Sequence, residues 1–385
     1  MKAGWEFKPL SEIGTLQRGF DLPKAQRTEG PFPLVTSSGL SDTHNVAKVK
    51  GPGVVTGRSG SIGNVFYVEK DFWPLNTALY VKDFHGNDPR FVHYLLQLID
   101  LGRFASGAGV PTLNRNDVHG EVIAVPSSVE EQQRIVAVLD EAFEGLARAR
   151  AHAEANLQNA RELFENFLSG LMASKSDEWT TYNFGDRNVL QIIDGDRGAN
   201  YPKKSDFMQE GHCLFLSTKN VRPDGFNFNE TMFISLEKDR ALRKGKLQAR
   251  DVLLTTRGTI GNIAFFDETV PFEHIRINSG MLVLRPNEKL IRAEFLFELL
   301  RSSVIKEQIA EHVSGAAQPQ LPIRSLVKFE LPVPKSTAEQ LHIVEQLKRL
   351  SDEVAILTER YSQSIRDIEE LRQSLLQKAF AGELT

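Results

Sequence analysis

Thiol chemistry is almost absent from this chain of 385 residues, which contains one cysteine, Cys213. A single thiol forms no internal disulfide and no multi-thiolate zinc site. The nine histidines are scattered without the spacing of metal ligands. We therefore expect no metal centre within the chain, and we interpret Cys213 as a small buried hydrophobic residue.

Signatures of membrane insertion and of catalysis are also missing. Residues 1–10 contain charges and no apolar segment of signal-peptide length, and no run approaches the roughly 20 apolar residues of a membrane span. The sequence lacks the G-x-x-x-x-G-K-[ST] nucleotide loop, the H-E-x-x-H zinc motif, the G-x-S-x-G elbow and the N/D-P-P-Y/F motif of amino-methyltransferases. We predict a cytoplasmic protein that has no catalytic activity of its own.

A strong charge of either sign is absent as well, because 46 basic and 50 acidic residues give a net charge of −4. Residues 1–127 contain 13 basic and 12 acidic residues, and residues 179–334 contain 21 and 19. The acidic excess lies in residues 128–178, with 5 and 10, and in residues 335–385, with 7 and 9. Two nearly neutral regions permit local basic patches but argue against strong unaided binding of a polyanion. We therefore expect any DNA binding to require a partner.

Proline is missing from two long segments, between Pro126 and Pro202 and beyond Pro334, and proline is the strongest helix breaker. Both segments open in the same way, because residues 128–131 and 336–339 each place a serine three residues before a glutamate. This spacing fits a capping box, in which both side chains satisfy free amides of the first helical turn. The sequence therefore predicts two long helices.

Both segments carry apolar residues at the alternating spacing of four and three that is typical of a coiled coil. The first series, interrupted at Asn156, is Ile135, Leu139, Ala142, Leu146, Ala149, Ala153, Ala160, Leu163 and Phe167. The second, interrupted at Ser364, is Ile343, Leu347, Leu350, Val354, Leu357, Tyr361, Ile368, Leu371 and Leu375. Small residues of the first series suit large residues of the second, so we predict that the helices pair over roughly 60 Å at ~1.5 Å per residue. The alternative is two amphipathic helices on separate globular bodies.

The chain repeats itself, because residues 128–139 and 336–347 share the pattern E-Q-x-R/H-I-V. Further matches are Ser106-Gly107-Ala108 with Ser314-Gly315-Ala316, Pro126 with Pro334, and residues 56–64 (T-G-R-S-G-S-I-G-N) with 255–262 (T-T-R-G-T-I-G-N). The period is far too long for a solenoid and indicates duplication of a domain. Each copy opens with a tryptophan, Trp5 or Trp179, which we expect to anchor a core.

Short apolar runs between Gly, Asn and Asp predict strands in both copies. They lie at residues 54–55, 65–67, 122–125, 214–216, 252–254, 263–266 and 281–284, and helical pieces are expected at 91–101 and 293–312. The fold class predicted is α+β, with two mixed domains, two long helices and an internal pseudo-two-fold repeat. The expected boundaries are 1–127, 128–173, 174–334 and 335–385, with a linker at 174–178.

Two repeated polar loops are the main candidate contact sites. Each contains an arginine, glycines, a hydroxyl residue and an asparagine: Arg58, Ser59, Ser61 and Asn64 in the first copy, and Arg257, Thr259 and Asn262 in the second. Such a loop suits contact with phosphates and base edges, since glycine lets the backbone approach a surface. The alternative is a glycine-rich hairpin in which the asparagine caps a turn.

Other candidates for contact with DNA lie in weaker patterns. They are Arg115 and Arg324 in a second repeated loop (P-T-L-N-R and P-Q-L-P-I-R), Ser37, Ser38, Lys219 and Asn220 after apolar strands, and the pair Lys203-Lys204. Packing of the second loop against the helix base and simple solvation of the charges remain alternatives.

These features together resemble the specificity subunit of type I restriction-modification systems over essentially the whole chain. The resemblance rests on both tryptophan openings, both E-Q-x-R/H-I-V helix starts and the ending L-L-Q-K-A-F-A-G-E-L-T at residues 375–385. Residues 163–171 echo this ending, and Gly170 and Gly382 are 212 residues apart, so about four extra residues are expected in the second helix.

The resemblance implies that two target-recognition domains lie at opposite ends of an antiparallel helix pair and that each reads half of a bipartite asymmetric DNA site. It implies that the helices set the spacer and dock two modification subunits, which methylate adenine N6 with S-adenosylmethionine. Two restriction subunits dependent on ATP and Mg²⁺ would complete the complex, and this chain would bind no cofactor, metal or membrane. A protein-binding scaffold and an unrecognised nuclease or methyltransferase remain as alternatives.

Overall fold

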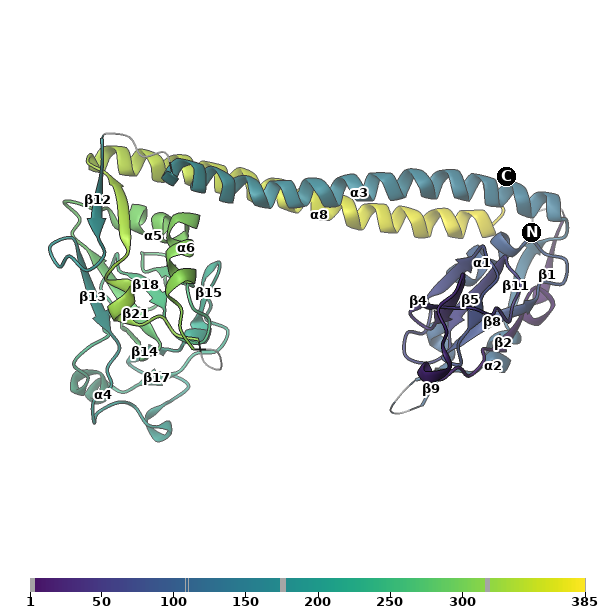
Figure 1. The fold of residues 1–385 in the computed structure, drawn as a ribbon, viewed down its shortest axis with the longest axis horizontal. Helices are drawn as coiled ribbons and strands as arrows, with labels where there is room; N and C mark the ends of the chain where they lie inside the picture. The colour runs from purple at the N-terminus through teal and green to yellow at the C-terminus, as the bar shows by residue number, and fades with distance from the viewer. Residues whose placement is uncertain (1–3, 108, 110, 174–177, 316–318, 385) are drawn as a thin grey trace. The chain divides into compact units, whose positions relative to one another are not determined.

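The computed structural model describes residues 4–107, 109, 111–173, 178–315 and 319–384. The chain forms two compact units, one of residues Met1–Ala155 with Tyr361–Thr385 and one of residues Asn156–Arg360. Each unit contains one mixed domain and parts of both long helices, α3 (Val129–Ala173) and α8 (Thr337–Phe380) (Figure 1). The predicted linker at 174–178, apart from Glu178, and the matched residues Ala108 and Ala316 lie outside the described residues.

The first domain consists of small sheets and short helices. Strand β1 (Trp5–Pro9) pairs with β11 (Val122–Pro126), which leads into α3. The central sheet has the order β2 (Thr15–Arg18), β8 (Ala78–Asp83), β5 (Gly53–Gly57), β6 (Val65–Val68). A second sheet has the order β4 (Gly39–His44), β3 (Phe32–Thr36), β7 (Trp73–Pro74). The other strands and α-helices are β9 (Ala105–Ser106), β10 (Thr112–Leu113), α1 (Pro89–Leu98) and α2 (Arg115–His119).

The second domain repeats this topology. Strand β12 (Trp179–Asn183) pairs with β22 (Glu330–Pro334), which precedes α8. The central sheet has the order β13 (Leu190–Asp194), β21 (Met281–Pro286), β18 (Val252–Thr255), β19 (Ile263–Phe265). The other sheet has the order β17 (Phe233–Ile234), β14 (Cys213–Leu216), β20 (Ile275–Ile277). The helices are α5 (Ala293–Arg301), α6 (Ser303–His312) and α7 (Ile323–Leu326).

The second domain is larger because it contains an insertion between β14 and β18. The insertion includes the hairpin β15 (Val221–Arg222) and β16 (Gly225–Phe226) and the helix α4 (Leu236–Ala241). All seven predicted strand runs are confirmed, and the helical piece expected at 293–312 is two helices that meet at buried Ser302. The α+β duplication is therefore confirmed.

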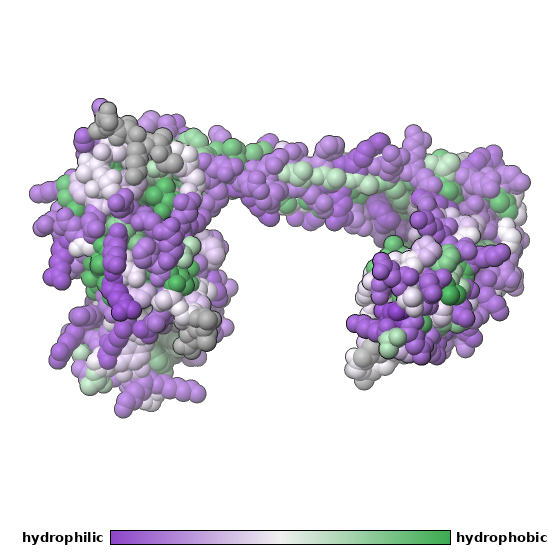
Figure 2. All heavy atoms as spheres, viewed as in Figure 1, coloured by the Kyte–Doolittle hydropathy of each residue, from purple (hydrophilic) through white to green (hydrophobic). Residues whose placement is uncertain are grey.

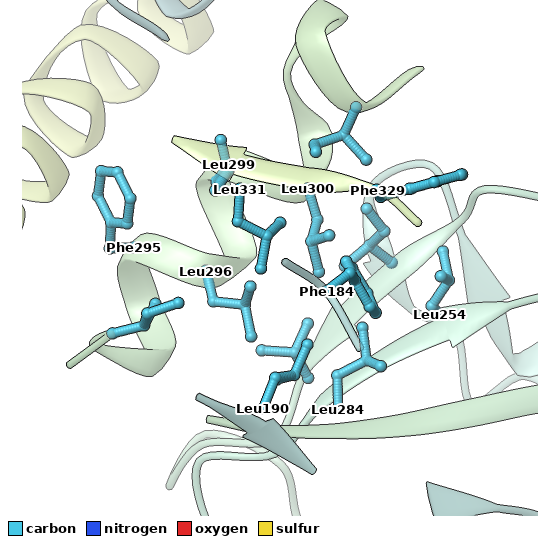
Figure 3. Packing of buried hydrophobic residues seen from close by; sticks show 14 of the residues in the cluster. Phe184, Leu190, Leu254, Leu284, Phe295, Leu296, Leu299, Leu300, Phe329 and Leu331 are labelled. Atoms are coloured by element: carbon cyan, nitrogen blue, oxygen red, sulfur yellow. The ribbon is translucent and has the colours of Figure 1, made fainter. Parts of the chain in front are cut away.

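Each domain has its own apolar core, to which the long helices contribute. In the second unit, α5 packs on the sheet, and Phe184, Leu190, Leu284, Leu296 and Phe329 meet in the cluster drawn in Figure 3. In the first unit, Trp5, Phe91 and Leu95 are buried beside residues of α3 and α8. Trp179 packs against the second core, so both tryptophans act as predicted. Cys213 is fully buried, and burial raises the pKa of its thiol to about 12.

Within each unit, the two long helices share a core. In the first unit, Ile135 and Leu139 of α3 cluster with Leu376 and Phe380 of α8, so the start of one helix lies beside the end of the other. In the second unit the roles are exchanged, because Phe164, Leu168 and Met172 of α3 cluster with Ile343 and Leu347 of α8. The predicted antiparallel pairing is confirmed within each unit.

The buried seam departs from the predicted heptads near the end of each helix. Leu163, Phe167 and Leu371, all placed on the seam, are 47, 40 and 49% exposed, and Ala149 is exposed as well. Phe164, Leu168 and Leu376 are buried instead. An α-helix has 3.6 residues per turn and drifts away from a strict heptad, and these last turns also pack on a domain core. The predicted seam was therefore one residue out in the last turns of both helices.

The predicted extra residues of the second helix are also absent. Helix α3 has 45 residues and α8 has 44. Leu168 and Leu376 are both fully buried, and their separation equals that of the two helix starts. The similarity of Gly170 to Gly382 was misleading because it rests on two glycines and not on burial.

A buried glutamine explains the repeated E-Q pair at the helix starts. The Oε1 atom of Gln132 accepts the backbone amide of Asp88, the residue before α1, at 2.9 Å, and its Nε2 donates to Asn87 Oδ1 at 2.8 Å. Gln340 does the same in the second unit, because its Oε1 accepts the amide of Arg292 at 2.8 Å and its Nε2 donates to two backbone carbonyls at 2.9 Å. Each glutamine therefore ties a long helix to the short helix of its domain.

Candidate nucleic-acid interface

In the first domain, three segments meet at the tip of the β5–β6 hairpin. The backbone amides of Arg58 and Ser59 donate to the carbonyl of Thr77 at 2.9 and 3.1 Å. The amide of Leu113 donates to the carbonyl of Arg58 at 2.7 Å. The second predicted loop, which begins at Pro111, therefore lies against the first predicted loop and the β7–β8 connection.

In the second domain, the same three segments meet through the same backbone bonds. The amides of Thr256 and Arg257 donate to the carbonyl of Gly280 at 2.8 and 3.2 Å. The amide of Leu321 donates to the carbonyl of Thr256 at 2.9 Å. Both domains thus present a rim, which we define as the hairpin tip, the loop before β8 or β21, and the segment before α2 or α7.

The hydrogen-bond register corrects the pairing of the two arginines. Arg58 accepts from the third segment as Thr256 does, and Ser59 occupies the position of Arg257. The sequence match of the arginines required a one-residue gap after them, whereas the strand pairing aligns residues 54–64 with residues 252–262 without a gap. Neighbouring residues of an extended chain point to opposite sides. The side chains of Arg58 and Arg257 therefore point to different sides of their rims.

The glycines of the two hairpin tips match in conformation. Gly60 and Gly63 have φ angles of 85° and 94°, and Gly258 and Gly261 have 73° and 86°. Glycine enters this left-handed region without steric cost. The two tips therefore share a backbone path, while the side chains between the glycines differ: Ser61 is half-buried and Thr259 is exposed.

The two arginines differ in exposure and in the contacts that they already make. Arg58 is half-buried, and its Nη1 donates to the carbonyl of Asn76 at 3.4 Å. Arg257 is exposed. Ser38 is exposed and its hydroxyl lies 3.0 Å from that of Ser61, whereas Ser37 is 7% exposed and turns inward. Ser37 therefore supports the rim, in contrast to its predicted role as a contact residue.

The asparagine candidates divide into exposed and structural residues. Asn64 is exposed, whereas Nδ2 of Asn262 donates to the carbonyl of Val221 at 2.9 Å. Asn220 is 4% exposed; its Nδ2 donates to two backbone carbonyls, and its Oδ1 accepts from the amide and hydroxyl of Ser217. A buried amide with every partner satisfied is committed to its loop. We correct the prediction for Asn220, which holds the turn after β14.

The lysine candidates are exposed but have acidic neighbours. Lys219 Nζ lies 3.7 Å from Glu230 Oε2. Lys203 and Lys204 lie at a short 3₁₀ turn, where the carboxylate of Asp206 accepts the Lys203 amide at 2.7 Å. This bond and the nearby Lys238 lower the pKa of Asp206, so the carboxylate keeps its charge beside the lysine pair.

Arg115 and Arg324 are exposed and lie in the first turns of the two short helices that follow the rims, Arg115 as the first residue of α2 and Arg324 as the second residue of α7. Arg115 Nη1 lies 3.5 Å from the carbonyl of Leu16. Hydrophilic side chains cover most of the visible face of each domain, with small apolar areas between them (Figure 2). Two rims with one backbone frame and different outward side chains are suited to bind two related but different polar surfaces.

Comparison with known proteins identifies the family of the chain. Residues 2–152 and 176–366 match the family model described as the type I restriction modification DNA specificity domain. The chain belongs to this family. The match occurs twice, once for each copy of the internal repeat, which agrees with the duplicated topology.

Several relatives are specificity subunits of type I restriction enzymes. The chain is 28% identical to the EcoBI specificity subunit of Escherichia coli over 41% of this chain and 33% of that protein. It is 25% identical to the EcoKI specificity subunit of E. coli K12, over 49% and 40%. These two matches span well under half of each relative. The match to the E. coli EcoDI specificity subunit covers 99% and 89% at 20% identity.

Two solved structures share the fold. A chain from a study of complex assembly and conformational transition of the type I R-M system matches with a TM-score of 0.78 and 19% identity, over 100% of this chain and 99% of that one. The HsdS subunit from Thermoanaerobacter tengcongensis matches with a TM-score of 0.59 and 20% identity, over 99% and 98%.

Sequence reasoning missed several rim residues. Asp21 and Asn76 join the first rim, and Arg197 joins the second. The signal in the sequence that could have located these residues was a glycine directly after a strand, Gly19 or Gly195. The structure shows why glycine is required there, because a Cβ would lie within 2.3 Å of a backbone oxygen. Within the ranges that the structure describes, no group of three potential metal ligands occurs, and no helix is long and apolar enough to cross a membrane.

Proposed function

We propose that this chain is the DNA sequence-specificity subunit of a type I restriction-modification complex, in which each rim reads one half of a bipartite site. The observation that carries the proposal is the repeated backbone frame with different outward side chains. A frame that fixes the approach of the backbone to DNA, with variable side chains, suits two readers of different sequences. Family membership and the named specificity subunits among its relatives support it.

In this proposal the chain is not catalytic by itself. Two modification subunits would dock on the long helices and methylate adenine N6 with S-adenosylmethionine. Two restriction subunits that use ATP and Mg²⁺ would complete the complex, so the cofactors would belong to the partners and the complex would act on DNA in the cytoplasm. The target base would leave the duplex for the methyltransferase, while the rims contact the bases that stay in the stack.

The first experiment is sequencing of methylated adenines in DNA from cells that express this chain with its methyltransferase partner, compared with cells that lack only this chain. We expect a bipartite motif that depends on the chain. If no motif depends on it, the chain is not the specificity element, and a protein scaffold becomes the better interpretation.

The length of the long helices leads to a separate prediction. Insertion of one heptad into both α3 and α8 lengthens a helix pair by ~10 Å, close to three base pairs of B-DNA at ~3.4 Å each. If the helices set the spacer, the gap between the half-sites will grow or methylation will fail. An unchanged gap with full methylation would remove that role from the helices.

A further inference from the structure

One pair of rim positions carries opposite charges in the two domains. Arg18 pairs with Leu79 across the β2–β8 ladder, and Asp194 pairs with Leu282 across the β13–β21 ladder. The next residues, Gly19 and Gly195, pass equally close to backbone oxygens, with a hypothetical Cβ at 2.3 Å from Leu75 O or 2.2 Å from Asn278 O. The positions are therefore equivalent, and Asp21 corresponds to Arg197.

Each domain places an ion pair across these positions, and its direction is reversed. In the first domain, Arg18 Nη2 lies 3.1 Å from Asp21 Oδ1. In the second, Arg197 Nη2 lies 3.0 Å from Asp194 Oδ2. Asp21 is 65% exposed and Arg197 is 50% exposed. Exposed ion pairs of this kind contribute little to stability, so either group is readily available to a ligand.

Both residues lie beside the hairpin tips. In the first domain, Asn76 Nδ2 donates to Asp21 Oδ1, and the carbonyl of Asn76 accepts from Arg58. In the second, Arg197 Nη2 donates to the carbonyl of Ser279 at 3.4 Å, and the next residue, Gly280, accepts the amide of Arg257. The reversed charges thus belong to the two rims.

The chemistry of DNA separates what the two groups can bind. A carboxylate is repelled by phosphate, and its productive partner in the major groove is an exocyclic amino group, N4 of cytosine or N6 of adenine. A guanidinium binds hydrogen-bond acceptors, either O6 and N7 of guanine or a phosphate oxygen. Arg197 also lines a hollow of about 380 Å³ with Arg243 and Lys244, and the carboxylates of Asp194 and Asp196 line the same hollow, so three cations face two anions there.

We propose that Asp21 and Arg197 are specificity-determining residues at equivalent positions of the two rims, and that Asp21 requires an amino-bearing base where Arg197 requires an acceptor. The inference rests on the proposed function. It predicts that the half-site of the first domain contains cytosine or adenine opposite Asp21.

The test is the methylated-adenine motif of variants in the assembled complex. Asp21→Ala should relax the first half-site at one position by about tenfold, the loss expected for one base contact, and leave the second half-site unchanged. Asp21→Asn keeps the shape and the acceptor for Asn76 but adds a donor, so it should shift the preference at the same position towards adenine, whose N6 and N7 fit an asparagine amide. The control is Glu69→Ala, because Glu69 is exposed beyond the opposite end of β6 from the hairpin tip.

Arg197→Ala separates the two acceptors. Relaxation at one base of the second half-site indicates guanine and supports the assignment of Arg197. Uniformly weaker DNA binding with a smaller salt dependence indicates phosphate and contradicts the assignment of Arg197 as a specificity-determining residue. Lys289→Ala, an exposed change beyond the far end of β21, is the control.

The outcomes keep the two proposals apart. A wild-type complex without a chain-dependent motif contradicts the proposed function. This inference alone is overturned if the wild-type complex has a normal motif, the folded variants Asp21→Ala and Asp21→Asn leave that motif unchanged, and Arg197→Ala leaves DNA binding unaltered.

Discussion

The two domains fill one position of a shared frame by opposite means. Trp73 on β7 and Arg276 on β20 occupy equivalent places beside β3 and β14. Trp73 is buried among Leu22, Leu34 and Leu75, whereas Arg276 is 5% exposed and bonded to Asp239. The strand pairing is therefore compatible with either an apolar anchor or a buried ion pair.

The ion pair of the second domain is unusually complete. Besides Asp239, the guanidinium of Arg276 donates to the carbonyls of Lys244, Asp239 and Leu242 at 2.7–3.1 Å. Burial by itself would raise the pKa of the Asp239 carboxyl, but hydrogen bonds from Lys246 and Arg276 hold it below its usual value. The pair fixes α4 of the insertion against the sheet, a task that the first domain does not have.

The largest effect is expected from breaking this pair on one side. Arg276→Met should destabilise the second unit by about 3–5 kcal/mol, because Asp239 is left buried with Lys246 as its main partner. The double variant Arg276→Met with Asp239→Leu should recover most of the loss. Hydrogen exchange resolved by unit measures both, with the first unit as internal reference. A cost below about 1 kcal/mol for the single variant would contradict this account.

A second difference concerns the short helix that packs on the long ones. His93 of α1 is buried, its Nδ1 has no partner among the described residues, and the equivalent residue of α5 is Phe297. Burial, followed by the charges of Arg90 and Arg372, lowers the pKa of His93 from 6.5 to about 4. Between these values the unfolded chain binds more protons, so the first unit loses stability as the pH falls from 6.5 towards 4.

This dependence should disappear in His93→Phe, which copies the second unit. The wild type should lose about 3 kcal/mol more than the variant over this range, at 1.36 kcal/mol per pKa unit. Urea unfolding of both proteins at pH 7, 5.5 and 4.5 measures the difference. Parallel pH profiles would show that His93 is not the group responsible.

Local patterns predicted much of this fold. The heptads, the capping serines and the missing prolines specified both long helices, because helix starts and apolar periodicity are encoded within a few residues. The alternation of short apolar runs with turn residues specified the strands. The seam failed at Leu163 and Phe167 because burial there depends on a domain core distant in the sequence, which a heptad count does not include.

The rims were predicted in part. The hairpin tips were found because glycines and an asparagine repeat, but the pairing of Arg58 with Arg257 was wrong by one residue, since register depends on strand pairing and not on letter matching. Asn220 looked like a surface polar residue until its backbone partners were known. Asp21 and Arg197 were invisible because opposite residue types at equivalent positions give no sequence similarity.

The helix starts offer a comparison in which both units should respond alike. Gln132→Ala should cost about 2 kcal/mol in the first unit, and Gln340→Ala the same in the second, because each leaves buried backbone groups unsatisfied. Exposed Gln133→Ala is the control and should cost less than about 0.5 kcal/mol. Exchange rates of α1 and α5 amides would locate each loss. A loss in the unit that keeps its glutamine would contradict the independence of the two ties.

The smallest effect should distinguish the two tryptophans. Trp179 Nε1 donates to Glu339 Oε1 at 3.3 Å, whereas Trp5 Nε1 is buried with no partner among the described residues. A ring replacement that removes the N–H loses a hydrogen bond in one unit and removes an unsatisfied donor in the other. Trp179→Phe should therefore cost about 1 kcal/mol more than Trp5→Phe, beyond the similar loss of ring area in both. As a control, Glu339→Gln keeps an acceptor for the indole and should retain most of the bond. Equal costs for the two tryptophan variants would show that the 3.3 Å contact between Trp179 and Glu339 contributes nothing to stability.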